Sequence, residues 1–206
     1  DDSRCRQRQS ANLWGIYHEP DGESIALKRT LLLADTDIFH RERFIQMGDS
    51  FLTLASAVGG LENSDHHLRW DFTFEDPTLS SRLFPYRWMY SLPFPKTKFL
   101  EPRLTTFVSG NLHVDRRALS LEHVRAHQAH IWGTHYAKRW VWGHCDTFVG
   151  SPGTVFEGLV AQIGLGPVSL PPLPLFCLIH EGKTTWANGF TNWVTNKSSH
   201  DLYHWQ

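Results

Sequence analysis

The residues best suited to chemistry lie between positions 123 and 148, a window that holds five histidines and three tryptophans. The stretch from Arg139 to Phe148 predicts a strand, in which successive side chains point to opposite faces. The even-numbered side chains would then share one face: Trp140, Trp142, His144, Asp146 and Phe148. Three aromatic rings beside an imidazole and a carboxylate indicate the wall of an apolar cavity that carries two polar groups.

Two other interpretations of this window stay open. The rings could be ordinary core, with His144 and Asp146 hydrogen-bonded to each other, because buried polar groups need partners. The histidines could also bind a metal ion, since His123 and His127 have the spacing that places two ligands on one helix face. However, the sequence contains no H-E-x-x-H, no glycine-rich nucleotide motif and no P-loop, and we therefore predict no metal and no cofactor.

The same window supports a mechanism in which an alkene is protonated. A carboxyl group in an apolar pocket keeps its proton near neutral pH, because desolvation raises its pKa. Asp146 is the first candidate acid, and Asp71 beside Trp70 is the second. His130 or His144 could orient water or a substrate hydroxyl as a general base.

The cation formed by protonation would need stabilisation without capture. Trp132, Trp140 and Trp142 could provide it through cation–π attraction, on the order of 1–2 kcal/mol for each desolvated ring. The candidate ligand-binding residues are therefore the aromatic side chains Trp132, Trp140, Trp142, Phe148 and Trp70, together with Asp71.

The elements that must position these groups are strands. Short apolar or alternating segments recur between turn signals, and Leu68 to Phe74 alternates with Trp70 on its apolar face. This pattern predicts an all-β fold of sandwich or barrel type. The proline-rich stretch Thr78 to Pro102 predicts a loop or edge segment that connects two β units, residues 1–104 and 105–206. Asn188-Gly189 predicts a hairpin turn into a strand over Phe190 to Val194.

Composition excludes several classes of partner. The 20 lysines and arginines nearly balance the 21 aspartates and glutamates, which argues against a nucleic-acid partner and a polybasic membrane anchor. No apolar run is long enough for a transmembrane helix. The three cysteines, an odd number at wide spacing, favour reduced thiols over a disulfide framework, and a cytoplasmic location is favoured with them. The sequence makes no prediction about the oligomeric state.

Two neighbouring motifs resemble a known superfamily. His130-Ile131-Trp132-Gly133 and Trp140-Val141-Trp142-Gly143-His144-Cys145 are similar to elements of the carotenoid 1,2-hydratase, tocopherol cyclase and AttH-like proteins. In the tocopherol cyclase branch the strand reads W-x-W-x-x-C-x-x-F. Leu68 to Phe74 and Pro95-Lys96-Thr97-Lys98 also look like the closing strand and linker of a first barrel.

This resemblance implies a double lipocalin-like (calycin) fold with β-barrels or strongly curved sheets. Known members are larger than this chain, so the resemblance implies β units that are incomplete or trimmed here. It also implies binding of an apolar isoprenoid or polyene and its acid-promoted hydration or cyclisation, the work of a lyase or cyclase. Two alternatives stay open, namely a carrier of hydrophobic ligands without chemistry and a lipocalin-type pericyclase.

Overall fold

The computed structural model describes residues 10–19, 22–40, 43–76, 79–93, 95–165 and 168–195 of the chain. It divides into two compact units, and each is formed from two separate segments. Unit 1 comprises Asp1–Thr78 and Thr106–His127, and unit 2 comprises Leu79–Thr105 and Gln128–Gln206. The boundary predicted between residues 104 and 105 falls inside a strand, Thr97–Val114, that belongs to both units.

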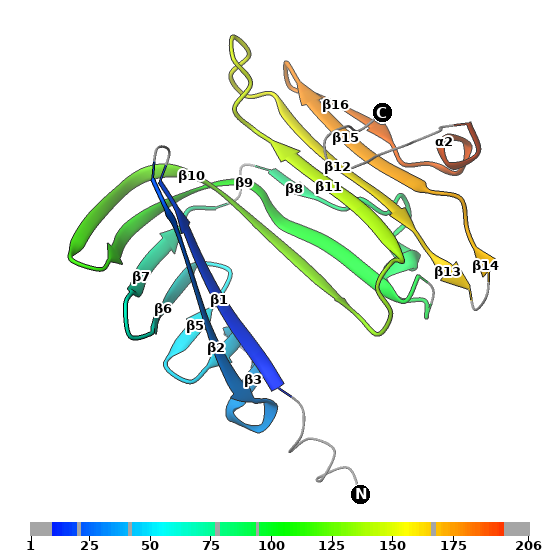
Figure 1. Cartoon of the computed structure of the whole chain (residues 1–206). Coiled ribbons are helices and arrows are strands. Elements are labelled where there is room, and N and C mark those ends of the chain that lie inside the picture. Colours follow the sequence, from blue (N-terminus) through cyan, green and yellow to red (C-terminus); the bar gives the residue numbers. More distant parts are fainter. Residues whose placement is uncertain are drawn as a thin grey trace, which may run out of the picture. The chain divides into compact units, whose positions relative to one another are not determined.

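Unit 1 is built from a hairpin and a larger antiparallel sheet (Figure 1). Its elements are β1 (Ser10–His18), β2 (Ser24–Leu32), η1 (Leu33–Asp35), β3 (Thr36–His40), β4 (Arg43–Met47), β5 (Ser50–Leu52), β6 (Ser56–Glu62), β7 (His67–Phe74) and the adjoining halves of β9 (Thr97–Val114) and β10 (Arg117–Gly133). The larger sheet has the order β10-β9-β7-β6-β5-β4-β3, and β1 pairs with β2 in a separate two-stranded sheet.

The core of unit 1 forms where the hairpin meets the sheet. Leu27 of β2 packs with Leu61, Leu68 and Val114 of β6, β7 and β9, and all four are buried. The alternation in β7 explains this arrangement, because Leu68 and Trp70 point to the core while Arg69 and Asp71 point away.

Unit 2 contains a four-stranded antiparallel sheet of order β11-β12-β15-β16. Its elements are β8 (Leu79–Ser81), η2 (Arg87–Tyr90), the remaining halves of β9 and β10, β11 (Arg139–Cys145), β12 (Val155–Gln162), β13 (Gly164–Leu165), β14 (Val168–Ser169), β15 (Leu173–His180), β16 (Lys183–Ala187) and α2 (Phe190–Thr195). Leu104 of β9 packs with Val155, Cys177 and Ile179 of this sheet in a second buried cluster.

The predicted all-β class is confirmed, since strands make up most of the described chain. The sheets of the described residues are open, so the barrel and the lipocalin-like fold stay predictions. Among the described residues, no helix has the length and apolar character required to cross a membrane.

One local prediction is refined and another is wrong. The proline-rich stretch, predicted as a loop or edge segment, contains η2 and the short strand β8, which pairs with β9, and β9 itself begins at Thr97. Asn188-Gly189 does not start a hairpin, since Phe190–Thr195 forms helix α2. The Asn188 side chain is buried and donates a hydrogen bond to the Leu83 carbonyl at 2.8 Å. This hydrogen bond holds the Asn188 side chain in the interior, whereas the predicted hairpin turn would place it at the surface.

Candidate functional site

The site of unit 2 begins on β11, the strand predicted to carry chemistry. The strand is extended from Arg139 to Cys145, and Trp142 and His144 lie on the same face, as predicted. Their rings stack with an interplanar angle of 12° and centroids 6.4 Å apart. Strand alternation therefore places an aromatic surface directly beside an imidazole.

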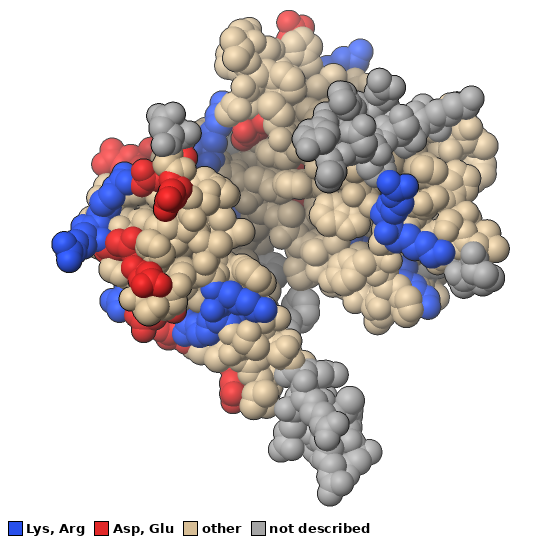
Figure 2. Space-filling model, in the orientation of Figure 1, with Lys and Arg blue, Asp and Glu red and all other residues tan. Residues whose placement is uncertain are grey.

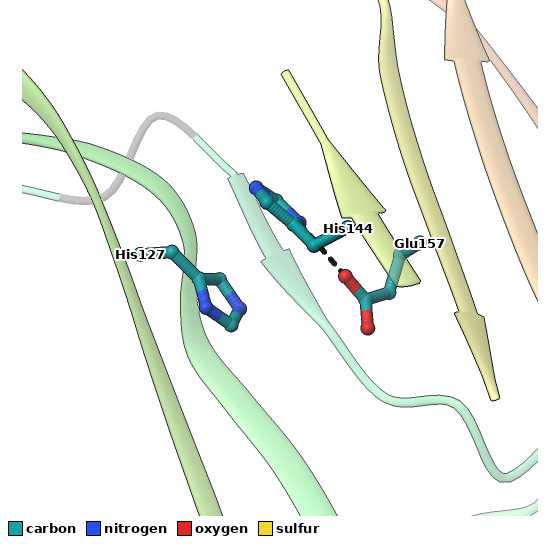
Figure 3. A group of neighbouring side chains, drawn as sticks. All are labelled: His127, His144 and Glu157. Atoms are coloured by element: carbon teal, nitrogen blue, oxygen red, sulfur yellow. Dashed lines mark hydrogen bonds and ion pairs between the residues drawn. The ribbon is translucent and has the colours of Figure 1, made fainter. Parts of the chain in front are cut away.

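The partner of both side chains is Glu157 on the adjacent strand β12. Glu157 stands opposite His144 in the antiparallel register, so the two side chains share one face of the sheet. His144 Nδ1 lies 2.8 Å from Glu157 Oε2. A dashed line marks this interaction in Figure 3. The indole N–H of Trp142 donates a hydrogen bond to Oε1 of the same carboxyl group. Both oxygens of this fully buried glutamate thus accept N–H donors.

Glu101 on β9 brings a second carboxyl group to this network. It is fully buried and shares a hydrogen bond with Glu157. Because both oxygens of Glu157 already accept hydrogen bonds from nitrogen, the proton between the two carboxyl groups is assigned to Glu101. A protonated acid therefore lies beside a carboxylate in a place without water contact.

An irregularity in β9 explains how Glu101 reaches the interior. In a regular strand, residues 101 and 104 face opposite sides, yet Leu104 packs with Cys177 and Glu101 contacts Glu157. The register of β8 with β9 shifts between the pairs Leu79–Thr105 and Ser81–Glu101, so that β8 advances by two residues while β9 advances by four. Pro102, which has no N–H to pair, falls within this bulge.

The electrostatics of Glu101 follow from its surroundings. Its pKa is raised from an ordinary value of 4.5 to about 9, first by burial and then by the hydrogen bond and charge of Glu157, against a smaller lowering by Ser81. Glu101 is therefore protonated at neutral pH. The thiol of Cys177, buried close by, also has a pKa raised to about 11, first by desolvation and then by the charges of Glu101 and Glu157.

A second aromatic group of unit 2 contains two of the predicted residues. His130 and Trp132 of β10 stack at 4.9 Å, and Trp132 lies 6.4 Å from Tyr90 of η2. Desolvation lowers the pKa of His130, which favours the neutral imidazole. Desolvation also raises the pKa of Tyr90, whose hydroxyl donates to the Phe99 carbonyl at 3.1 Å.

The remaining predicted residues lie elsewhere. Trp140 is 60% exposed, and Asp146 and Phe148 follow the end of β11, so the strand is three residues shorter than predicted. Trp70 and Asp71 belong to unit 1, where Trp70 packs on the core and Asp71 pairs with Val58 and Asn111 across the sheet.

Sequence reasoning missed the two glutamates. Glu101 stands next to a proline in a segment interpreted as a linker, and Glu157 lies in a strand without another titratable side chain. The sequence did contain a signal for Glu157. In VFEGLVAQ it is the only charged residue among side chains typical of a buried strand, and a buried carboxyl group needs partners.

Two potential metal ligands lie together among the described residues of unit 2. Imidazole and carboxylate are metal ligands, and His144 and Glu157 could supply two of them in unit 2, fewer than catalytic zinc sites use. His127, drawn with them in Figure 3, is the last residue of unit 1.

A separate cavity of about 440 Å³ lies on unit 1 and is lined by the titratable residues Glu62, His67, Arg69 and His113. None of these side chains is among the predicted ligand-binding residues. In the view of Figure 2, charged side chains gather over unit 1, whereas the visible surface of unit 2 is mostly uncharged.

Comparison with known proteins gave no relatives: no family model, no curated protein and no solved structure matches this chain.

Proposed function

We propose that unit 2 binds an apolar isoprenoid- or polyene-like molecule and catalyses its acid-promoted hydration or cyclisation, with Glu101 as the proton donor. The observation that supports the proposal is the pair of fully buried carboxyl groups, Glu101 and Glu157, which Trp142 and His144 hold through hydrogen bonds. Burying such a network in a protein core is costly, and perturbed carboxyl groups of this kind concentrate at functional sites.

The chemistry requires an acid that stays protonated at neutral pH. Glu101 would donate its proton to one carbon of a double bond, and the neighbouring carbon would become a cation. Addition of water to the cation, with return of a proton to Glu101, gives an alcohol and regenerates the acid. Addition of another double bond of the same substrate, followed by loss of a proton to Glu101, gives a ring.

The groups around Glu101 fit the other requirements of this reaction. The indole of Trp142 could stabilise the cation by cation–π attraction, about 1–2 kcal/mol when desolvated. Glu157 adds negative charge near the same place, and His144 orients Glu157 through a 2.8 Å hydrogen bond. Trp142 is 40% exposed, so its ring offers a ligand a contact surface, while its N–H contacts Glu157.

This proposal keeps the chemistry expected from the superfamily resemblance but changes the residue that carries it. Asp146 was the first candidate acid, and it stands beyond the end of β11. Glu101 replaces it because burial keeps its carboxyl group protonated.

The test is to incubate the protein with farnesol and with a linear carotene and to search for products by mass spectrometry. A hydrated product gains one water, and a cyclised product keeps its mass but changes its retention time. Glu101→Gln should lower turnover by about 100-fold or more, the loss typical of a general acid. Asp146→Asn and the surface variant Glu181→Gln should retain turnover. An active Glu101→Gln protein would rule out the proposed acid.

A binding-only function is the second candidate, and one observation favours it. Both carboxyl groups are fully buried, so a ligand could lie on the exposed rings of Trp140 and Trp142 without reaching them. Quenching of tryptophan fluorescence by farnesol, with no product from the wild-type protein, would establish a carrier instead of an enzyme.

A further inference from the structure

Arg103, two residues after Glu101 on β9, is a buried cation. It is only 5% exposed, and its Nε has no hydrogen-bond partner among the described residues. No carboxylate of those residues forms an ion pair with it. The side chain is therefore largely withdrawn from water, without a counter-charge from the part of the chain that the structure describes.

An arrangement of this kind is unfavourable unless an anion completes it. Arginine cannot remove this charge by losing its proton, because the guanidinium stays protonated in proteins. A buried and unpaired charge strongly destabilises a fold, whereas a bidentate anionic partner offsets much of that cost. The planar guanidinium matches carboxylate and phosphate groups, which accept two parallel N–H bonds from it.

The neighbouring titratable groups do not supply the missing charge. Glu101 is protonated and so carries no negative charge for Arg103. Its pKa is set by desolvation, Glu157 and Ser81, and Arg103 does not contribute to it. Glu157 accepts hydrogen bonds from Trp142 and His144.

Lys98, the other buried cation on this half of β9, does not compete for an anion. Its Nζ donates to the backbone carbonyls of Leu92, at 2.9 Å, and Pro95. Lys98 therefore holds the preceding loop, and Arg103 is the cation that is left for a ligand.

We infer that Arg103 binds the anionic head, a phosphate or a carboxylate, of the apolar molecule that unit 2 takes as its ligand. This inference rests on the proposed function and specifies its substrate class: an apolar chain with an anionic end, such as a prenyl diphosphate or a fatty acid. The head group would be held on the same strand as the acid, two residues from Glu101.

The first experiment compares ligands that differ only in the head group, with tryptophan quenching as the readout. Farnesyl diphosphate is paired with farnesol, and hexadecanoate is paired with hexadecanol, so that the two arms separate phosphate from carboxylate. The wild-type protein should bind at least one anion about tenfold or more tightly than its alcohol, as a charge-assisted hydrogen bond provides. Arg103→Met should lose this preference, and Arg103→Lys should keep part of it. The exposed Arg139→Met serves as the matched control.

The second experiment needs no organic ligand and so separates this inference from the proposed function. The melting temperature of the wild-type protein should rise with inorganic diphosphate, and that of Arg103→Met should not. Without diphosphate, Arg103→Met should melt at least about 2 °C higher than the wild type, because an unpaired buried charge has been removed.

The outcomes are distinct. A head-group preference that depends on Arg103 supports the inference even if no product is ever formed. Equal binding of anions and alcohols, or a lower melting temperature for Arg103→Met together with an unchanged response to diphosphate, overturns it. In the latter case another part of the chain is the partner of Arg103. Binding of neither farnesol nor hexadecanol would instead count against the proposed function.

Discussion

At the scale of single residues, Glu157 is the centre of the site because three side chains meet at its carboxyl group. Trp142, His144 and Glu101 all bond to it, although it is fully buried. Satisfying a buried carboxylate in this way fixes the rotamers of its partners, so these side chains act as a unit.

The indole N–H of Trp142 should contribute to the stability of the fold through its hydrogen bond to Glu157. Trp142→Phe keeps an aromatic ring but leaves one oxygen of buried Glu157 without this donor, and it should lower the free energy of unfolding by about 1–3 kcal/mol. Trp186→Phe is the control, because Trp186 lies on the same sheet with a similar exposure of 41%. Urea denaturation of both variants measures the difference, and equal losses would contradict the role given to the hydrogen bond.

At the scale of elements, strands with regular side-chain alternation could be predicted from the sequence, whereas the bulge that interrupts β9 could not. The strand over Arg139 to Cys145 and the apolar face of β7 follow directly from the residue pattern. The passage of β9 through Pro102 does not, because proline predicts the end of a strand unless a bulge accommodates it. The candidate site was missed for the same reason: Glu101 stands at that bulge, and the register that pairs His144 with Glu157 is a tertiary feature.

Gly110 tests the close approach of two strands in unit 1. It has a φ of 141°, and a Cβ at this position would lie 2.0 Å from the carbonyl oxygen of Asp71 on β7. Gly110→Ala should therefore destabilise the protein by on the order of 3 kcal/mol or more. Gly153→Ala is the matched control, since Gly153 also has a positive φ, 85°, but open space around it. Thermal melts that show similar losses for both variants would refute the steric argument.

At the scale of the whole molecule, the chain enters each unit more than once. Two strands, β9 and β10, each contribute one part to unit 1 and another to unit 2. A single boundary in sequence cannot describe this arrangement. Composition and turn signals predict local segments, and they do not reveal that one strand contributes residues to the cores of two units.

The protonation of Glu101 should be visible in global stability. Its pKa of about 9 in the folded protein exceeds the ordinary value of 4.5, so the folded state holds a proton that the unfolded state has released between these pH values. Stability should consequently fall as pH rises from about 4.5 to 9, by at most about 1.4 kcal/mol per pH unit. Glu101→Gln should flatten this slope, and Glu181→Gln should not. The measurement is the urea midpoint across the range, and identical slopes in all three proteins would contradict the assignment.

The thiol of Cys177 makes the interior of unit 2 observable. It is 1% exposed, and its pKa of about 11 keeps it in the unreactive form at neutral pH. Iodoacetamide should therefore alkylate Cys177 only when this sheet transiently opens, whereas half-buried Cys145 on β11 should react faster. The alkylation rate of Cys177 would thus report how often the sheet opens in the native state, and a bound ligand should lower that rate.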